Sequence, residues 1–341
     1  MSELRKDPLV ERWVIIAPER GRFPWPLTPE PAPPPDAVSP FAEGQEAHTP
    51  PEIWAVRAPG TPPNSPGWDV RVVPNRFPAL QVEGQLDGQA EGIFDAVAGI
   101  GAHEVIVEAP RADVDLCDLP APHLALVLLA YIERIRDLRR DLRLRYVAVF
   151  RNKGRAAGAT VNHPLSQLVA LPTIPPLPMA KLRSAREHYR RKERSIFSDI
   201  IRQEEAHGER VVLQTEHFIV LAPYASRSPF ELVIYPRRQC HDLTLISDAE
   251  RLDLAEVLGN VLRRLRVALN DPPYNYMLFT SPNAIPRPGR ADWWSSLEVD
   301  YRWHLEIVPR LTAAGGFSAA SGCYLNPVAP EEAAAFLRTV S

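Results

Sequence analysis

The stretch that decides the fold is YVAVFRNKGRAAGATVNHPLSQLVALP, residues 146–172, in which two apolar segments flank a polar loop. Residues 146–150 and 168–171 are rich in β-forming side chains, so each segment predicts a strand. Between them lie Gly154 and Gly158, and a glycine lets the backbone approach a ligand closely. The stretch therefore predicts two core strands joined by a ligand-binding loop.

Three basic residues, Arg151, Lys153 and Arg155, belong to the same loop. Cations beside glycine-flanked backbone amides are typical of anion sites. A solvated surface loop would have a similar composition, but the position between two core strands next to Gly158 favours contact with an anion. We expect that anion to be a phosphate group.

Outward from this stretch, the pattern of strands and helices occurs twice. In the first half, strands are expected at 13–16, 70–73 and 104–108 and a helix at 121–144; in the second, strands at 231–236, 274–279 and 303–309 and a helix at 248–269. This repetition predicts an internal duplication of the α+β class, with two tandem halves whose mostly antiparallel sheet is flanked by helices.

The boundary between the halves is expected near Pro172, which gives an N-terminal half at 1–172 and a C-terminal half at 173–341. A charged helix should follow from 179 to about 207, and a closing helix should span 330–338. Prolines crowd residues 24–66, so an irregular surface segment is predicted there.

Composition narrows the class of partner. With a formal net charge of -3 over 341 residues, the chain has no excess positive field, so nucleic-acid binding is not expected. No apolar run approaches the roughly 18 residues of a membrane span, and the charged start lacks a signal-peptide pattern, so we expect a cytoplasmic protein. Cys117, Cys240 and Cys323 are too few and too far apart for a disulfide framework and are expected to be buried.

Several motifs in fixed order carry a family resemblance. They include LRKDPLVERWVIIAPER at the start, VRVVPNRFPAL, GAHEVIVEAP, FRNKGRAAGATVNHP, YRWHLEIVPRLT and PVAPEEAAAFLR at the end. On these motifs the chain resembles the galactose-1-phosphate uridylyltransferase family, a duplicated member of the histidine-triad superfamily. The resemblance covers nearly the whole length and implies a homodimer with shared sites.

Enzymes of that family attack the α-phosphorus of UDP-glucose with a histidine, hold the uridylyl group covalently, and pass it to galactose 1-phosphate. Their motif is His-Pro-His, a small residue and Gln, and here it reads His163-Pro164-Leu165-Ser166-Gln167. Leu165 stands at the position of the nucleophile and has no lone pair to offer phosphorus. The resemblance therefore implies a nucleotide-binding protein with impaired nucleotidylyl transfer.

The resemblance also assigns ligand-binding residues. It implies a UDP-sugar or other nucleotide as ligand and a hexose 1-phosphate as second substrate. Asn75 and Phe77 match positions near the uridine, and Phe317 lies where the sugar phosphate is held. Four further residues match nucleotide-binding positions of the loop and the strands that flank it: Asn152, Gly158, Thr160 and Gln167. Arg20 matches a basic residue that, in the family, reaches the site of the neighbouring subunit.

Zinc-binding relatives carry four ligands, of which only His163 is present here. The other positions read Ser39, Ala42 and Ala112. One imidazole cannot hold a four-coordinate zinc ion, so no structural zinc is expected.

A second metal site in some relatives gives weaker candidates. Glu204 and His304 match its ligands, Glu306 replaces one histidine by another ligand type, and Phe279 replaces the last. Three such groups could hold a divalent ion, although an ion-paired cluster explains them as well. The sequence therefore assigns no cofactor to the protein.

Two other functions stay open. The chain could be an active nucleotidyltransferase or phosphorylase in which His163 or a bound ion makes the attack, or a structural or regulatory partner without a ligand. His163 could equally be a packed remnant. No function is assigned to His103, His217 or His241.

Overall fold

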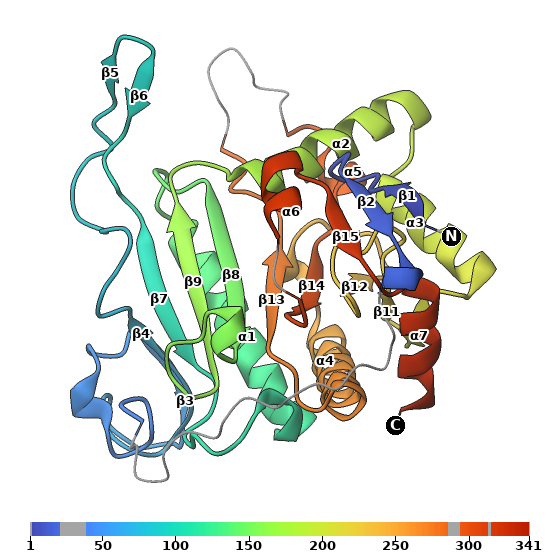
Figure 1. Cartoon of the computed structure of the whole chain (residues 1–341). Helices are drawn as coiled ribbons and strands as arrows, with labels where there is room; N and C mark the ends of the chain where they lie inside the picture. The colour runs from blue at the N-terminus through green and yellow to red at the C-terminus, as the bar shows by residue number, and fades with distance from the viewer. Residues whose placement is uncertain (1, 21–38, 286–293, 313–314, 341) are drawn as a thin grey trace.

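A computed structural model of the chain describes residues 2–20, 39–285, 294–312 and 315–340. Its centre is one ten-stranded sheet to which both halves contribute (Figure 1). All neighbouring strands in it pair antiparallel. In spatial order the strands are β10 (Val211–Gln214), β11 (Phe218–Leu221), β12 (Leu232–Pro236), β14 (His304–Pro309), β13 (Tyr274–Phe279), β8 (Tyr146–Lys153), β9 (Leu165–Leu171), β7 (Ala102–Val107), β4 (Trp68–Pro74) and β3 (Trp54–Arg57).

The two halves meet in the middle of this sheet, where β8 pairs with β13. Strand order on either side of that pair is the same when it is read outward from the centre. In the pairing register Asn275 of β13 lies opposite Asn152 of β8. A residue of the second half therefore adjoins the glycine loop of the first.

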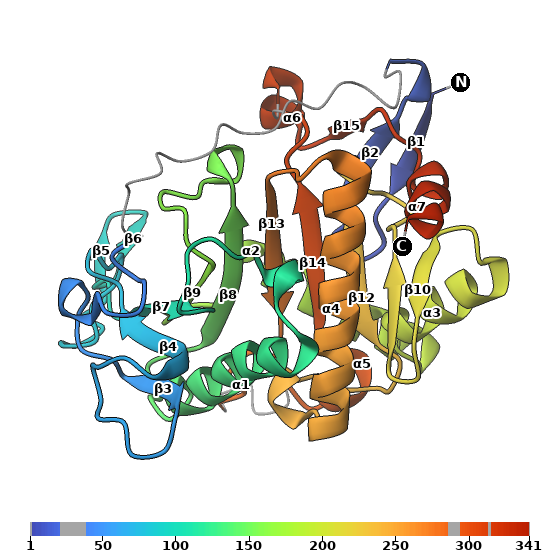
Figure 2. The same ribbon diagram turned by 90° about the horizontal axis from the view of Figure 1, so that it is seen from below.

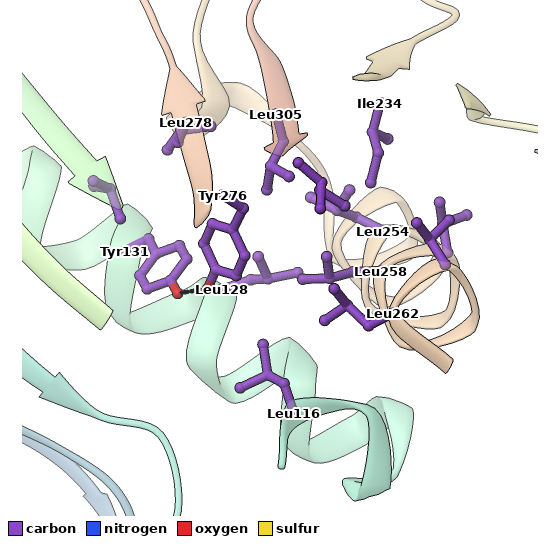
Figure 3. Close-up of a cluster of buried hydrophobic side chains, with 14 of the residues drawn as sticks. Leu116, Leu128, Tyr131, Ile234, Leu254, Leu258, Leu262, Tyr276, Leu278 and Leu305 are labelled. Carbon is purple, nitrogen blue, oxygen red and sulfur yellow. Dashed lines mark hydrogen bonds between the residues drawn. The ribbon is translucent and has the colours of Figure 1, made fainter. Parts of the chain in front are cut away.

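Helices α1 (Ala121–Leu138) and α4 (Asp248–Leu269) cover one face of the sheet (Figure 2). Apolar residues at helical spacing on both helices, such as Leu128, Leu258 and Leu262, pack against sheet residues that include Tyr276 and Leu305 (Figure 3). A capping box between Ser247 and Glu250 begins α4. This burial fixes which strand residues face the helices and which face the opposite side.

The second half is also covered on the opposite face. Helices α2 (Pro176–Lys192) and α3 (Ile196–His207) bring Leu182 and Phe197 against Val233 and Tyr235 of β12. The smaller elements around this layer are β1 (Glu3–Lys6), β2 (Trp13–Ile16) and β15 (Tyr324–Asn326), which form a three-stranded sheet, the helices α5 (Leu297–Asp300), α6 (Gly316–Ser321) and α7 (Pro330–Thr339), and the hairpin β5 (Gln89–Glu91) and β6 (Phe94–Ala96), which projects away from the sheet (Figure 1).

The predicted strands and helices are present, with corrections to several bounds. The helix predicted at 179–207 is two helices, because Glu193 takes a left-handed conformation (φ 56°) within the run 190–195, which has no apolar residue to hold a helix on the core. Helix α1 ends at Leu138 rather than near 144. Strand β9 begins at Leu165 rather than 168, so the motif reaches into a strand.

Three further expectations concern the proline-rich segment, the cysteines and membrane-spanning helices. The proline-rich segment is partly regular, because β3 lies within it; its residues 24–38 fall outside the described ones. Cys117 and Cys240 are buried as expected, whereas Cys323 is half-exposed, and all three are free. Among the described residues no helix is both long and apolar enough to cross a bilayer.

Candidate functional site

A cavity of about 430 Å³ opens on the face of the first-half strands opposite α1, since Val105 and Gln167 line it while the alternate residues Ile106 and Leu168 belong to the core cluster under the helix. Eight residues singled out from the sequence line it together: Asn75, Phe77, Asn152, Gly158, Thr160, His163, Leu165 and Gln167. Arg20 and Phe317 do not line it. Arg20 lies exposed at the end of the short 3₁₀ helix η1 (Pro18–Arg20), and Phe317 is 54% exposed in α6.

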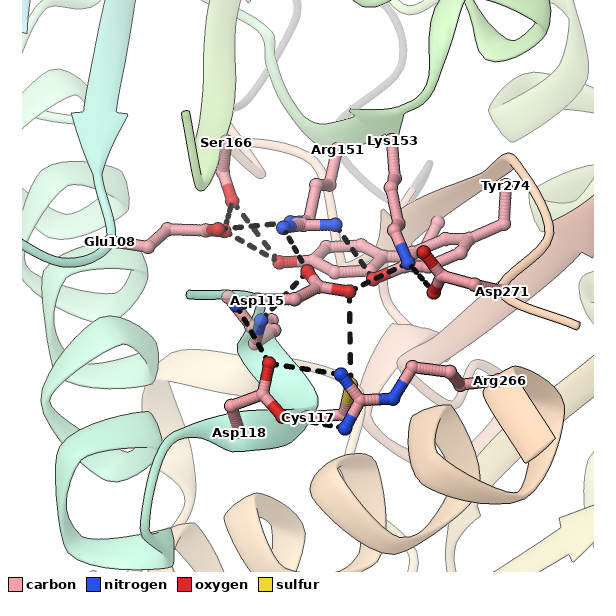
Figure 4. A network of polar contacts seen from close by, with 12 residues as sticks. Glu108, Asp115, Cys117, Asp118, Arg151, Lys153, Ser166, Arg266, Asp271 and Tyr274 are labelled. Atoms are coloured by element: carbon pink, nitrogen blue, oxygen red, sulfur yellow. Dashed lines mark hydrogen bonds and ion pairs between the residues drawn. The ribbon is translucent and has the colours of Figure 1, made fainter. Parts of the chain in front are cut away.

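Two basic residues of the glycine loop, Arg151 and Lys153, point away from this cavity. Side chains alternate between the faces of a strand, so Asn152 faces the cavity while Arg151 and Lys153 point to the helix side. There Arg151 binds Glu108 at 2.9 Å and Asp115 at 2.8 Å, and Lys153 binds Asp115 at 2.8 Å (Figure 4). The expectation that these two cations contact an anionic ligand is wrong.

The carboxylates and tyrosines around Arg151 form a buried network behind the site (Figure 4). Burial alone would raise the pKa of Asp115, but Arg151 and Lys153 lower it well below its usual range. Glu108 also accepts a hydrogen bond from the hydroxyl of Ser166. Since Ser166 lies between Leu165 and Gln167, the network holds the strand that carries both cavity residues.

His163 lies two residues before this strand and is buried. Its Nε2 lies 2.9 Å from the carbonyl oxygen of Ala109, and because a carbonyl only accepts, Nε2 carries the proton and Nδ1 the lone pair. Nδ1 is buried without a partner among the described residues. Burial lowers the pKa of His163 to about 4, so the imidazole is neutral near pH 7.

Leu165 follows two residues later and faces the same cavity. It pairs with Val107 of β7, and its half-buried side chain lines the cavity between His163 and Gln167. The backbone at residue 165 is therefore regular β-strand, and the side chain that it presents to the cavity is an alkyl group. The side chain can exclude water and pack against a ligand, and it can do no covalent chemistry.

Sequence reasoning missed His103, which orients Gln167. The backbone N–H of Ala79 donates to Nδ1 of His103 at 3.2 Å, so the proton of the neutral ring is on Nε2. Nε2 lies 2.9 Å from Oε1 of Gln167 and donates to it, which leaves the Gln167 amide hydrogens for the cavity. The same nitrogen lies 3.1 Å from Nδ2 of Asn75, so His103 contacts two cavity residues. A histidine in a strand whose only other polar residue is Glu104 was the available signal.

Two residues of the second half also reach the site and were not expected from the sequence. Asn275 contacts Asn152 at 2.7 Å, and Arg310, just beyond β14, contacts Asn275. Their position follows from the pairing of β8 with β13, which no pattern within one half can reveal.

The residues at the implied zinc site do not fit the metal. Described residues contain no group of three or more His, Cys, Asp or Glu that could hold an ion. The nitrogen Nε2 of His163 is occupied by Ala109, and the segment carrying Ser39 and Ala42 is held by backbone bonds such as Glu43 N–H to the carbonyl of Pro110 at 2.9 Å.

The second candidate metal cluster is also occupied, by an ammonium group. Lys181 lies between His304 and Glu306, with Nζ 2.6 Å from Nε2 of His304. Glu204 is not a third member of this pair, because both its oxygens bind Arg210, at about 3.0 Å. Glu204 therefore does not lie with the other two weak candidates, His304 and Glu306, whose contacts match the ion-paired alternative.

Two family models match consecutive parts of the chain. Residues 1–175 match the N-terminal domain of galactose-1-phosphate uridyl transferase, and residues 181–282 match the C-terminal domain. Among curated proteins, ADP-glucose phosphorylase of Arabidopsis thaliana is 34% identical over 99% of this chain and 93% of its own. Galactose-1-phosphate uridylyltransferase of Thermotoga maritima is 26% identical over 99% of this chain and 98% of its own.

Solved structures agree with these matches. The crystal structure of an ADP-glucose phosphorylase from Arabidopsis thaliana with bound ADP-glucose superimposes with a TM-score of 0.81 at 32% identity, covering 100% of this chain and 99% of the other. A uridylyltransferase structure gives a TM-score of 0.74 at 30% identity, covering 99% and 98%. Both similarities extend over the entire fold rather than over one half.

Proposed function

Because the chain belongs to the galactose-1-phosphate uridylyltransferase family, we propose that it binds a nucleoside diphosphate sugar in the 430 Å³ cavity and transfers nucleotidyl groups poorly or not at all. The observation that carries the proposal is Leu165. It lies on a well-formed strand and lines the cavity, and it has no nucleophilic atom. By the motif resemblance it occupies the position at which the nucleophile is expected. Loss of a nucleophile costs about a million-fold in turnover in serine proteases.

Nucleotide binding has independent support from the cavity lining. Asn152, Thr160 and Gln167 offer amide and hydroxyl donors for phosphate oxygens, and Gly158 (φ +87°) lets the backbone approach closely. Phe77 is 82% exposed at the cavity edge, where its ring can stack on a nucleobase. These groups support the proposal that the cavity binds a nucleotide, whereas the side chain of Leu165 supplies no group for transfer.

Adenine and uracil are both reasonable bases. A relative at 34% identity is an ADP-glucose phosphorylase and others are uridylyltransferases, so ADP-glucose and UDP-glucose are the first ligands to test. A hexose 1-phosphate as second ligand and a homodimer belong to the same proposal. The exposed positions of Phe317 and Arg20 suit contacts with a second subunit.

The decisive experiment compares the native protein with Leu165→His. Both are titrated with ADP-glucose and UDP-glucose, then assayed with galactose 1-phosphate or orthophosphate as acceptor, and checked for a covalent nucleotidyl adduct by mass spectrometry. We expect both to bind and only the variant to form the adduct. An adduct on the native protein would refute the loss of transfer, and failure of both proteins to bind would refute the nucleotide site.

One observation favours a second function, that of an active transferase or phosphorylase that uses His163. Its ring is neutral, and Nδ1 has a lone pair without a partner among the described residues. Since Nδ1 is buried, attack would require a rearrangement that exposes it to the ligand. Here His163→Asn would abolish a native adduct that Leu165→Ala leaves intact.

A further inference from the structure

The amide of Asn152 can present either its oxygen or its NH₂ group to a ligand in the cavity. An NH₂ group attracts phosphate oxygens, whereas a carbonyl oxygen repels them. Which one faces the cavity is therefore decisive for an anionic ligand. Three contacts of Asn275, of which one reaches Asn152, determine the answer.

Asn275 has only one orientation that satisfies its partners. Its Oδ1 accepts from Nε of Arg310, and a guanidinium group has only donors. Its Nδ2 donates to the carbonyl oxygen of Ala157 at 2.8 Å, and a carbonyl only accepts. A donor at one end and an acceptor at the other exclude the flipped amide.

This orientation passes to Asn152. Nδ2 of Asn275 lies 2.7 Å from Oδ1 of Asn152 and donates to it, so Oδ1 is turned away and Nδ2 of Asn152 points in the other direction. A methyl group built on Gly158 would lie 3.6 Å from that Nδ2. Since Asn152 and Gly158 both line the cavity, the donor end of the amide is on the cavity side.

Arg310 itself adds positive charge at this end. Among the described residues it forms no ion pair with a carboxylate, whereas Arg151 and Lys153 are fully paired behind the sheet. Burial, and then the neighbouring Arg227, lower the pKa of Arg310, so an anion nearby would stabilise its charged form. The second half therefore supplies a cation that contacts Asn275, and through Asn275 it acts on Asn152.

We propose that Asn275 and Arg310 are positioning residues of the nucleotide site: they hold Asn152 as an N–H donor toward the phosphate groups of the ligand. The inference rests on the proposed function, because it requires an anionic nucleotide. It gives the junction of the two halves a role, since the second half sets the polarity of a cavity that the first half builds.

Titration with ADP and with adenosine tests the proposal. In Asn275→Asp the new side chain has only acceptors, so Asn152 must turn over and present its oxygen; we expect ADP affinity to fall about 10- to 100-fold, the cost of a lost charged hydrogen bond. Adenosine has no phosphate and should lose less than about twofold. Asn275→Leu, which adds no charge, should cost ADP several-fold, and Asn260→Leu on α4 is the matched control with unchanged affinity.

A double-mutant cycle separates positioning from direct contact. Arg310→Met should weaken ADP binding several-fold in the native protein and have little further effect in Asn275→Leu, because Arg310 acts through Asn275. Equal losses in both backgrounds would show a direct contact and overturn the role of Arg310. Unchanged ADP affinity in folded Asn275→Leu would overturn the role of Asn275.

An NMR measurement without ligand keeps the inference testable if the proposed function fails. The side-chain NH₂ resonances of Asn152, identified by their absence in Asn152→Ser, should shift in Asn275→Asp because Nδ2 then donates to a carboxylate. Resonances that stay in place would refute the orientation. If the native protein binds neither ADP nor UDP, the nucleotide site is refuted. The NMR measurement still decides the direction of the hydrogen bond between Asn275 and Asn152.

Discussion

The ammonium group of Lys181 donates to Nε2 of His304 across 2.6 Å inside the second half. Nδ1 of His304 donates to the carbonyl oxygen of Arg302 at 3.0 Å, so the ring is neutral with its lone pair toward the ammonium. The same ammonium binds Glu306 and lies 3.4 Å from the ring centre of Phe279. A side-chain cation thus holds a cluster whose residues the sequence suggested as metal ligands.

Removing that cation should destabilise the protein. Lys181→Met leaves Glu306 buried with Arg227 as its remaining ion pair, so we expect the free energy of unfolding to fall by about 3 kcal/mol. The measurement is urea denaturation followed by circular dichroism. The double variant Lys181→Met with Glu306→Gln has neither the ammonium nor the carboxylate, so it should be more stable than the two single losses added together predict. A double variant whose loss of stability equals the sum of both single losses would contradict the pairing.

The stability of the fold should fall as the pH drops from about 6.5 toward 4. Burial lowers the pKa of His163 to about 4 and that of His304 to about 3, with Lys181 a further cause for His304. An unfolded histidine has a pKa near 6.5, so in this window the unfolded chain binds more protons than the folded chain, and acid favours unfolding. Their contribution is complete above about pH 6.5.

Each histidine can contribute up to about 1.4 kcal/mol per pH unit within its window. Urea denaturation at pH 7.5, 6.0 and 5.0 should therefore show a steep loss of stability, and His163→Asn and His304→Asn should each flatten the dependence by about one proton. Identical slopes for both variants and the native protein would show that neither ring is held neutral.

How far the sequence predicted the site differs from residue to residue. Strand periods and family motifs located Asn152, Leu165 and Gln167 in one cavity. They did not show that Arg151 turns away from it, because a basic residue next to a glycine loop has the same composition on either face. The alternation of side chains along a strand decides which face Arg151 points to, and it applies to Arg151 because β8 extends to Lys153.

Contacts between the halves could not be predicted from the sequence, for another reason. Asn275 and Arg310 reach Asn152 through the pairing of β8 with β13, and that register depends on three-dimensional packing. Likewise Lys181, rather than Glu204, joins His304, because the chain turns at Glu193 and places α2 and α3 separately. Local patterns cannot specify such long-range neighbours.

Arg151 and Lys153 should matter for stability and not for ligand binding. Arg151→Met removes the partner of the buried Glu108 and should cost about 3–5 kcal/mol. Lys153→Met, at a less buried site, should cost about 1 kcal/mol and leave ADP affinity unchanged. Calorimetric titration of Lys153→Met is the direct check. A clear loss of ADP affinity in this variant would restore the loop cations as phosphate ligands.

His103 should affect ligand binding through Gln167. In His103→Leu the oxygen of Gln167 loses its donor, so the amide can rotate and present its oxygen to the cavity part of the time; we expect nucleotide affinity to fall by about three- to tenfold. His103→Asn provides the comparison, because its amide NH₂ can still donate to Gln167 if it reaches. In Gln167→Leu the further change His103→Leu should have almost no effect, since the group it orients is gone. The measurement is ADP titration of the four variants at matched folded fractions. A His103→Leu loss that persists undiminished without Gln167 would contradict the role through Gln167 and point to the other contact of His103, with Asn75.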